Sequence, residues 1–242
     1  MNQPTAHPLT YFDRVFVINL ESRRDRHREM DRQLRSIGLS LDCRPIELFS
    51  AIRPADKGEF DSVGTRGCFM SHLGVLQRAV SGAYARILIF EDDLNFVAGF
   101  KERLAAAVAV LDNCPWDLFY GGYLLPDGVT FASGVQYVSP KQALVAAHFL
   151  ALSARAVALA APFLETLLSH KAGDPNGGPM HVDGAYSWLR QANPQLITRI
   201  AVPPLGYQRA SRTDIHQLRW FDRFPITRHA VSVARIVKNF LR

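Results

Sequence analysis

The most constraining feature of the sequence is a run of four large apolar residues, 87–90, that leads directly into three carboxylates, Glu91, Asp92 and Asp93. Such a run is typical of a strand buried on both faces in an α/β sheet, where ligands bind at the carboxyl ends of the strands. Adjacent carboxylates repel one another unless a cation holds them, and hard divalent ions such as Mg²⁺ and Mn²⁺ prefer oxygen ligands. The segment therefore predicts a metal site, with a solvated acidic turn as the alternative.

Apolar segments with strand and helix periodicity alternate along the chain, which predicts one α/β domain with a mixed, mostly parallel central sheet flanked by helices. The Gly121-Gly122 pair is expected to end the strand before it. Strands are predicted at residues 14–20, 45–49, 86–90, 116–120, 134–138, 146–152 and 196–202, and helices at residues 25–37, 67–79, 100–111, 154–168 and 183–190.

The composition is that of an ordinary globular protein, with 48% hydrophobic and 21% charged residues among 242. No apolar stretch approaches the ~20 residues that span a membrane, and the polar start has no apolar core of a secretory signal. We therefore expect a cytoplasmic protein. Its expected organisation is a polar lead at 1–13, one domain at 14–217 and a basic segment at 218–242.

Residues 209–242 carry the whole net charge of +6, because they contain eight Lys and Arg against two Asp. Five apolar residues there are spaced four and three apart, which predicts a basic amphipathic helix. Such a helix is typical of binding to an anionic membrane surface or a partner. Packing on the domain is the alternative. The apolar residues are Ile226, Ala230, Val233, Val237 and Phe240.

Several common chemistries have no support in the sequence. Cys43, Cys68 and Cys114 are odd in number and widely spaced, which predicts neither a disulfide framework nor a zinc site but three reduced structural thiols. No P-loop, no Gly-x-Gly-x-x-Gly and no Gly-x-Ser-x-Gly motif occurs. His72 follows Ser71 directly, so the two do not form a hydrolase dyad. By itself, His72 is expected to be a buried, hydrogen-bonded histidine.

The first strand ends in a polar segment that contains Asn19, Arg23 and Arg26. Polar and cationic groups between a strand and a helix N-terminus form a plausible anion or nucleotide site. The alternative is a charged first helical turn.

Residues 15–20, with Arg23, Asp25 and Arg26, resemble the opening motif of glycosyltransferase family 25, which contains lipooligosaccharide and collagen galactosyltransferases. The resemblance covers about residues 14–215, with the motifs in the family's order. Later segments that resemble the family are Gly67-Cys68 with Ser71-His72-Leu73, residues 89–93, His181-Val182-Asp183, and Pro203-Pro204-Leu205 with Gln208 and Ser211.

The resemblance implies a GT-A-like fold, a nucleotide-sugar donor, commonly UDP-galactose, and inversion at the anomeric carbon. A Mn²⁺ or Mg²⁺ ion held by Asp93, with Asp92 or Glu91, would bridge the diphosphate and stabilise charge as the glycosidic bond breaks.

The other donor-site residues follow from the same resemblance. Asn19, Arg23 and Arg26 would face the nucleotide, and Ser71 and His72 would line the donor site or support it.

Inversion needs a general base for the acceptor hydroxyl, and a carboxylate within hydrogen-bond reach can act as one. Asp183, at a predicted helix start after a Gly/Pro-rich loop, is the candidate, with a helix N-cap as the alternative. His181 or His216 would be a further metal or phosphate contact, or a surface histidine.

The sequence thus predicts a metal-dependent inverting glycosyltransferase that moves a hexose, galactose in the first instance, to a cell-surface glycan such as lipopolysaccharide core. The expected location is the cytoplasm, with peripheral contact to the inner face of an anionic membrane. The alternatives are a non-catalytic relative that acts as a binding or scaffold subunit, and a metal-dependent phosphohydrolase. Nucleic acid is not an expected partner, because the basic charge is confined to one segment.

Overall fold

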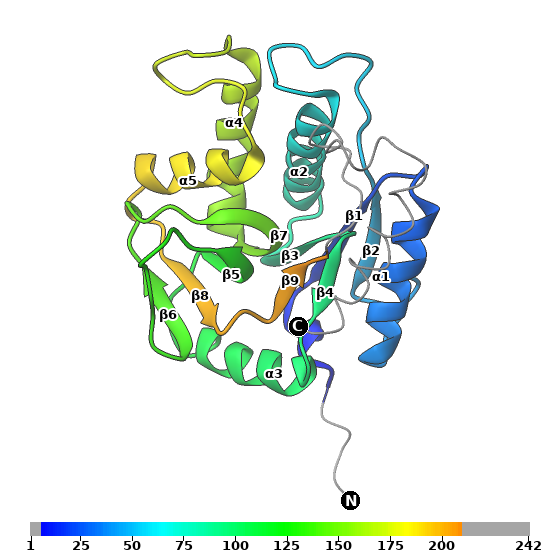
Figure 1. Ribbon diagram of the computed structural model, residues 1–242. Helices are drawn as coiled ribbons and strands as arrows, with labels where there is room; N and C mark the ends of the chain where they lie inside the picture. Colours follow the sequence, from blue (N-terminus) through cyan, green and yellow to red (C-terminus); the bar gives the residue numbers. More distant parts are fainter. Residues whose placement is uncertain (1–5, 210–242) are drawn as a thin grey trace, which may run out of the picture.

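The computed structural model describes residues 6–209 as an α/β unit with a central sheet (Figure 1). The strands are Arg14–Asn19 (β1), Ile46–Ser50 (β2), Arg86–Glu91 (β3), Leu94–Phe96 (β4), Leu118–Leu124 (β5), Gly134–Val138 (β6), Val145–Ser153 (β7), Thr198–Val202 (β8) and Gly206–Gln208 (β9). The helices are Pro8–Tyr11 (η1, a 3₁₀ helix), Arg24–Ser36 (α1), Val63–Ser81 (α2), Phe100–Leu111 (α3), Ala154–Ser169 (α4) and Val182–Ala192 (α5).

Seven of the strands described form one sheet in the order β2-β1-β3-β7-β5-β8-β6. Strands β1, β2 and β3 are parallel, and β5 and β8 run in the same direction. Only β7 and β6 run the opposite way within this sheet. The predicted mixed, mostly parallel sheet with flanking helices is confirmed.

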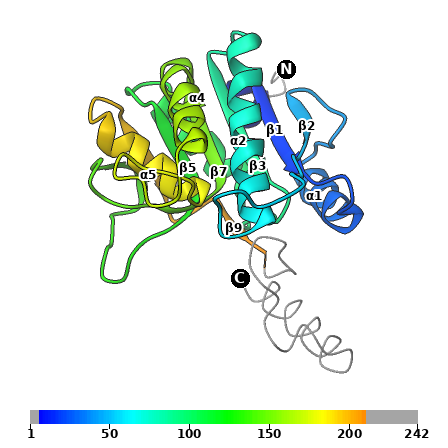
Figure 2. The ribbon, with the colours of Figure 1, turned by 90° about the horizontal axis from the view of Figure 1, so that it is seen from above.

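Alternate residues of the central strands enter two separate cores, one on each face of the sheet. Phe16 and Ile89 point to the face covered by α2, α4 and α5. Val17 and Phe90 point to the face covered by η1, α1 and α3. Helices α2 and α4 pack against each other over the sheet (Figure 2). Both faces are therefore buried, which is why residues 87–90 are an uninterrupted apolar run rather than an alternating one.

The prediction that Gly121-Gly122 ends a strand was wrong, because β5 continues through both glycines to Leu124. The neighbouring strand β7 places two rings in the space that side chains at these positions would fill. A Cβ on Gly121 would lie 2.6 Å from the ring of Phe149. A Cβ on Gly122 would collide with the ring of His148. The glycines therefore allow close approach of side chains from β7 and do not mark a turn.

Two further differences concern element boundaries near the site. Helix α2 begins four residues earlier than predicted, and its N-cap Ser62 accepts a hydrogen bond from the backbone N–H of Thr65 at 3.0 Å. Helix α5 has His181 as its N-cap, so the alternative role of Asp183 as an N-cap was wrong. Asp183 lies instead in the first turn, where a carboxylate interacts favourably with the helix dipole.

The predicted amphipathic helix in residues 218–242, with Ser211 and His216, lies outside the residues that the structure describes. Between residues 6 and 209, no helix has the length and apolar character needed to cross a membrane.

Candidate functional site

The polar ends of β1 and β3 meet because these strands are parallel neighbours, with Ile18 opposite Glu91. Asn19 donates a hydrogen bond from Nδ2 to Oδ2 of Asp92 at 2.7 Å. Arg26, in the first half of α1, donates from Nη1 to Oδ1 of Asp92 at 2.7 Å. Asp92 is buried. Both of its oxygens therefore have strong partners, and the side chain ties the turn after β3 to α1.

Asp93 lies beside Asp92 but has a different environment. Its Oδ2 accepts a hydrogen bond from Nε2 of Gln208 at 3.2 Å and lies 3.4 Å from Nη1 of Arg26. Its Oδ1 is buried without a hydrogen-bond partner in the described structure. Burial raises the pKa of Asp93 to about 7, against the opposing effect of Arg26, and the charges of Glu91 and Asp92 raise it further. An unpartnered buried carboxylate oxygen beside two other carboxylates fits a divalent cation.

Gln208 reaches Asp93 through a short ribbon that sequence patterns did not predict. Strands β4 and β9 pair in antiparallel register, with Leu94 opposite Gln208. The backbone N–H of Arg209 also donates to the carbonyl of Asp93 at 2.6 Å. The ribbon thus fixes the turn between β3 and β4 from the side opposite α1.

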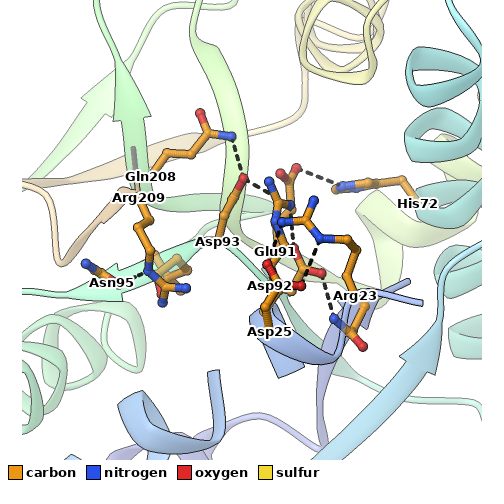
Figure 3. Close-up of polar contacts among 12 residues, drawn as sticks. Arg23, Asp25, His72, Glu91, Asp92, Asp93, Asn95, Gln208 and Arg209 are labelled. Atoms are coloured by element: carbon orange, nitrogen blue, oxygen red, sulfur yellow. Dashed lines mark hydrogen bonds and ion pairs between the residues drawn. The ribbon is translucent and has the colours of Figure 1, made fainter. Parts of the chain in front are cut away.

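Glu91 faces away from this ribbon, towards α2 (Figure 3). Its Oε1 lies 3.4 Å from Nε2 of His72, whose Nδ1 lies 3.3 Å from the hydroxyl of Tyr186. His72 has no exposed surface, so the expectation of a buried, hydrogen-bonded histidine is confirmed. Burial is the largest effect on Glu91 and opposes its ionisation, but the hydrogen bond from His72 and the electrostatic effects of His72, His148 and Arg26 together lower its pKa. Asp93 and Glu91 therefore make their contacts on opposite sides of the acidic turn.

A pocket of about 290 Å³ opens beside these carboxylates. The end of β1, the start of α1, the loop after β2 and one face of α2 form its walls. Three arginines line it, Arg23, Arg26 and Arg53, together with Glu91 and Asp92. A cavity that combines several guanidinium groups with a carboxylate cluster fits an anionic ligand together with a cation.

The remaining predicted donor-site residues have structural partners as well. Arg23 donates two hydrogen bonds to Asp25, at 2.9 and 2.8 Å, and this contact lowers the pKa of Asp25 to about 2. Ser71 accepts a hydrogen bond from the backbone of Ile52 at 2.8 Å and donates one to the carbonyl of Gly67 at 2.6 Å. Both Arg23 and Ser71 line the pocket.

Asp183 lies in the first turn of α5 and does not line the pocket. Its Oδ2 accepts a hydrogen bond from the backbone of Ala146 at 2.9 Å, and its Oδ1 accepts one from Gly184 at 2.8 Å. Each carboxylate oxygen has a second lone pair beyond these bonds. His181 lies 3.9 Å from Asp61, at the surface.

Sequence reasoning missed Arg53, Tyr186 and the approach of Cys68 to Glu91. Arg53 and Tyr186 belong to no recognised motif, and only tertiary packing brings them to the site. One sequence signal was available for Cys68 and His72: they are four residues apart, and such residues lie on the same face of a helix.

The overall fold of the chain is shared with a known structure. A glycosyltransferase involved in the glycosylation of the major capsid of PBCV-1 superposes with a TM-score of 0.50 and 8% sequence identity, covering 83% of this chain and 93% of that chain. This likeness concerns the fold alone, which is GT-A-like.

Sequence comparison finds a similarity to one family over part of the chain. The family model "Glycosyltransferase family 25 (LPS biosynthesis protein)" matches residues 12–114. Procollagen galactosyltransferase 1-A of Xenopus laevis is 33% identical over 129 residues, which is 46% of this chain and 21% of that protein. The probable inactive glycosyltransferase 25 family member 3 of Bos taurus is 31% identical over 129 residues, 46% of this chain and 22% of that protein. The match covers less than half of the chain, so glycosyltransferase family 25 is the family that residues 12–114 resemble.

The matched segment ends before β5, and the chain spans about a fifth of the length of these relatives. It contains Asn19, Arg26, His72 and the carboxylates after β3, but none of the residues that reach the site from α5 and β9.

Proposed function

We propose that the protein is a metal-dependent inverting glycosyltransferase that transfers a hexose, galactose in the first instance, from a UDP-sugar. The observation that carries this proposal is the buried, unpartnered Oδ1 of Asp93, whose Oδ2 lies 3.4 Å from Arg26, one of the arginines that line the pocket. A UDP-sugar matches both features, because its diphosphate is anionic and its leaving group needs stabilisation by positive charge.

The chain's own residues have distinct parts in this reaction. Asp93 is the proposed ligand for Mn²⁺ or Mg²⁺, because Asp92 is occupied by Asn19 and Arg26. When bound, the ion would supply positive charge to the diphosphate as the bond to the sugar breaks. Arg23 and Arg26 would orient the diphosphate in the pocket, since guanidinium groups bind phosphate oxygens in pairs.

Asp183 is the proposed general base. The two backbone hydrogen bonds that it accepts hold its carboxylate in one orientation. A fixed carboxylate can take the proton of an acceptor hydroxyl that lies within hydrogen-bond reach. The acceptor would enter between α5 and the acidic turn, opposite the donor pocket. Single displacement from this side would invert the anomeric carbon.

The proposed acceptor is a cell-surface glycan such as lipopolysaccharide core, assembled at the cytoplasmic face of a membrane. The family's description as an LPS biosynthesis protein supports this choice. The names of the procollagen galactosyltransferases support galactose as the sugar. The basic segment at 218–242 is the proposed contact with anionic lipid.

A non-catalytic role is the second candidate, because several similar relatives are described as inactive members of the family. The acidic turn argues against it here. Glu91, Asp92 and Asp93 are all present, and Asp93 keeps a carboxylate oxygen without a hydrogen-bond partner. A scaffold has no need to bring three carboxylates together.

Replacement of Asp93 by alanine tests the proposal. We expect the Asp93→Ala variant to lose at least about 1,000-fold in the rate of UDP release from UDP-galactose with Mn²⁺, since metal catalysis contributes several kcal/mol. Asp127→Asn is the matched control, because Asp127 is an exposed carboxylate in a loop. Full turnover by the Asp93→Ala variant would contradict the metal assignment, and a wild-type protein that binds UDP without turnover would favour the scaffold.

A further inference from the structure

A second group of potential metal ligands lies on the other side of the acidic turn from Asp93. Among residues 6–209, Cys68, His72 and Glu91 bring one ligand atom each to within 4.8 Å of one another. Cys68 and His72 come from α2, and Glu91 ends β3. All three line the pocket. Neither Asp92 nor Asp93 belongs to this group.

The separation of the histidine and glutamate atoms is long for a hydrogen bond and also fits two ligands of one shared ion. Nε2 of His72 lies 3.4 Å from Oε1 of Glu91. A charge-assisted hydrogen bond of this kind is normally about 2.7–2.9 Å long. Two ligands of a tetrahedral zinc ion, with bonds of about 2.0–2.2 Å, lie roughly 3.3–3.5 Å apart. The observed distance therefore matches the separation of two ligands of one tetrahedral ion.

The surroundings of His72 support the same conclusion. Metal-bound histidines almost always use their second ring nitrogen in a hydrogen bond that fixes the ring. Nδ1 of His72 lies 3.3 Å from the hydroxyl of Tyr186, and the two rings meet edge to face. Both residues are fully buried. The ring of His72 is thus held with Nε2 directed at Glu91. Cys68 lies one helical turn away, on the same face of α2.

We propose that Cys68, His72 and Glu91 form a three-ligand site for a soft divalent cation of the Zn²⁺ type, with the fourth position facing the pocket. Thiolate and imidazole ligands select such ions, whereas Mg²⁺ and Mn²⁺ prefer oxygen. Binding releases the thiol proton of Cys68 to solvent, because only the thiolate ligates the metal. Catalytic zinc sites typically have three protein ligands and one open position, whereas structural zinc sites have four protein ligands. This site does not depend on the proposed donor or on Asp93.

Cobalt(II) provides a direct test, because it takes the place of Zn²⁺ and gives a thiolate-to-cobalt absorption band in the near ultraviolet. The full-length protein is dialysed against chelator and titrated with CoCl₂ without nucleotide. We expect the band to saturate at about one equivalent per chain. Cys68→Ser should abolish it. Cys43→Ser and Cys114→Ser are matched controls that should keep it, since neither residue belongs to the group.

No band in the wild-type protein, or a band that persists in Cys68→Ser, would overturn the proposal. If Cys68→Ser fails to fold by circular dichroism, Glu91→Gln decides instead, and cobalt affinity that is unchanged in this variant would overturn the site. Because no nucleotide is present, a negative result leaves the glycosyltransferase proposal standing. We likewise expect Asp93 variants that lose UDP binding to keep the cobalt band.

Tyr186→Phe tests the positioning role of the tyrosine hydroxyl. This variant keeps the buried ring and removes only the hydrogen bond to His72. We expect cobalt affinity to fall about 10- to 100-fold, which is the usual effect of removing such a partner. An unchanged affinity would show that Tyr186 does not orient a metal ligand, and would remove this support for the site.

Discussion

The two halves of the described chain contribute to the site in different ways. In the first half, β1 and β3 are parallel neighbours, and the residues that follow each strand meet directly, as Asn19 and Asp92 do. In the second half, Tyr186 and Gln208 reach the same place from α5 and β9, whose contacts with it are tertiary. The first half therefore positions the charged side chains of the site, and the second half supplies the residues that enclose the acidic turn.

The largest expected effect in the second half concerns Asp183. If it is the general base, Asp183→Asn should lower kcat by about 10²- to 10⁴-fold, because the amide cannot accept the acceptor's proton. The KM for the donor should stay unchanged, since Asp183 does not line the donor pocket. Steady-state kinetics at saturating acceptor separate the two parameters. A raised donor KM with normal kcat would instead give Asp183 a structural role.

In the first half, the buried ion pair of Arg26 should matter more for stability than an exposed pair on the same helix. Arg26→Ala leaves Asp92 buried without its cation, so we expect a loss of about 3 kcal/mol of unfolding free energy. Arg35→Ala is the matched control on α1, because its pair with Asp31 is largely exposed and should contribute little. Urea denaturation measures both. Equal effects would contradict the tight anchoring of Asp92.

Asp93 should make the metal-free protein less stable as the pH rises. Its folded pKa is about 7, well above the ordinary value of 3.8, so the folded state holds an extra proton between about pH 4 and 7. The unfolding free energy should therefore fall across this range. Asp93→Asn should remove the slope and stabilise the protein by about 2 kcal/mol at about pH 8.

Asp25 provides a control, because its pKa is shifted in the opposite direction to that of Asp93. Its folded pKa is lowered to about 2, so its contribution is present above the ordinary value of 3.8 and is lost as the pH falls through about 2. Asp25→Asn should therefore leave the slope between about pH 4 and 7 unchanged. A flat profile in the wild-type protein would contradict the buried state of Asp93.

The smallest expected effect tests the close packing of β5 on β7. Gly121→Ala forces the ring of Phe149 to move and should cost about 1–2 kcal/mol of unfolding free energy. Gly184→Ala is the control, because its nearest neighbour is the flexible side chain of Met180 at 3.4 Å and alanine favours the helix. Thermal unfolding compares the two. A neutral Gly121→Ala variant would contradict the stated reason for the glycine.

The sequence predicted those parts of the molecule whose partners lie close along the chain. Helix α3 begins and ends where its periodicity predicted, and the polar residues after β1 and β3 meet as their strand ends required. The ribbon of β4 and β9 was not predicted, because its strands are three residues long and pair across the whole fold. The close packing at Gly121 could not be predicted for the same reason, because the ring of Phe149 that fills the space beside it belongs to β7.

The central claim is that Asp93 couples a divalent cation to a nucleotide-sugar in the arginine-lined pocket. Isothermal titration of the full-length protein with UDP, with and without Mn²⁺, tests it most directly, with Asp93→Asn measured alongside. The account predicts that Mn²⁺ strengthens UDP binding to the wild-type protein at least about tenfold and has no effect on the variant. Equal UDP affinity with and without Mn²⁺, or a variant that responds like the wild type, would contradict it.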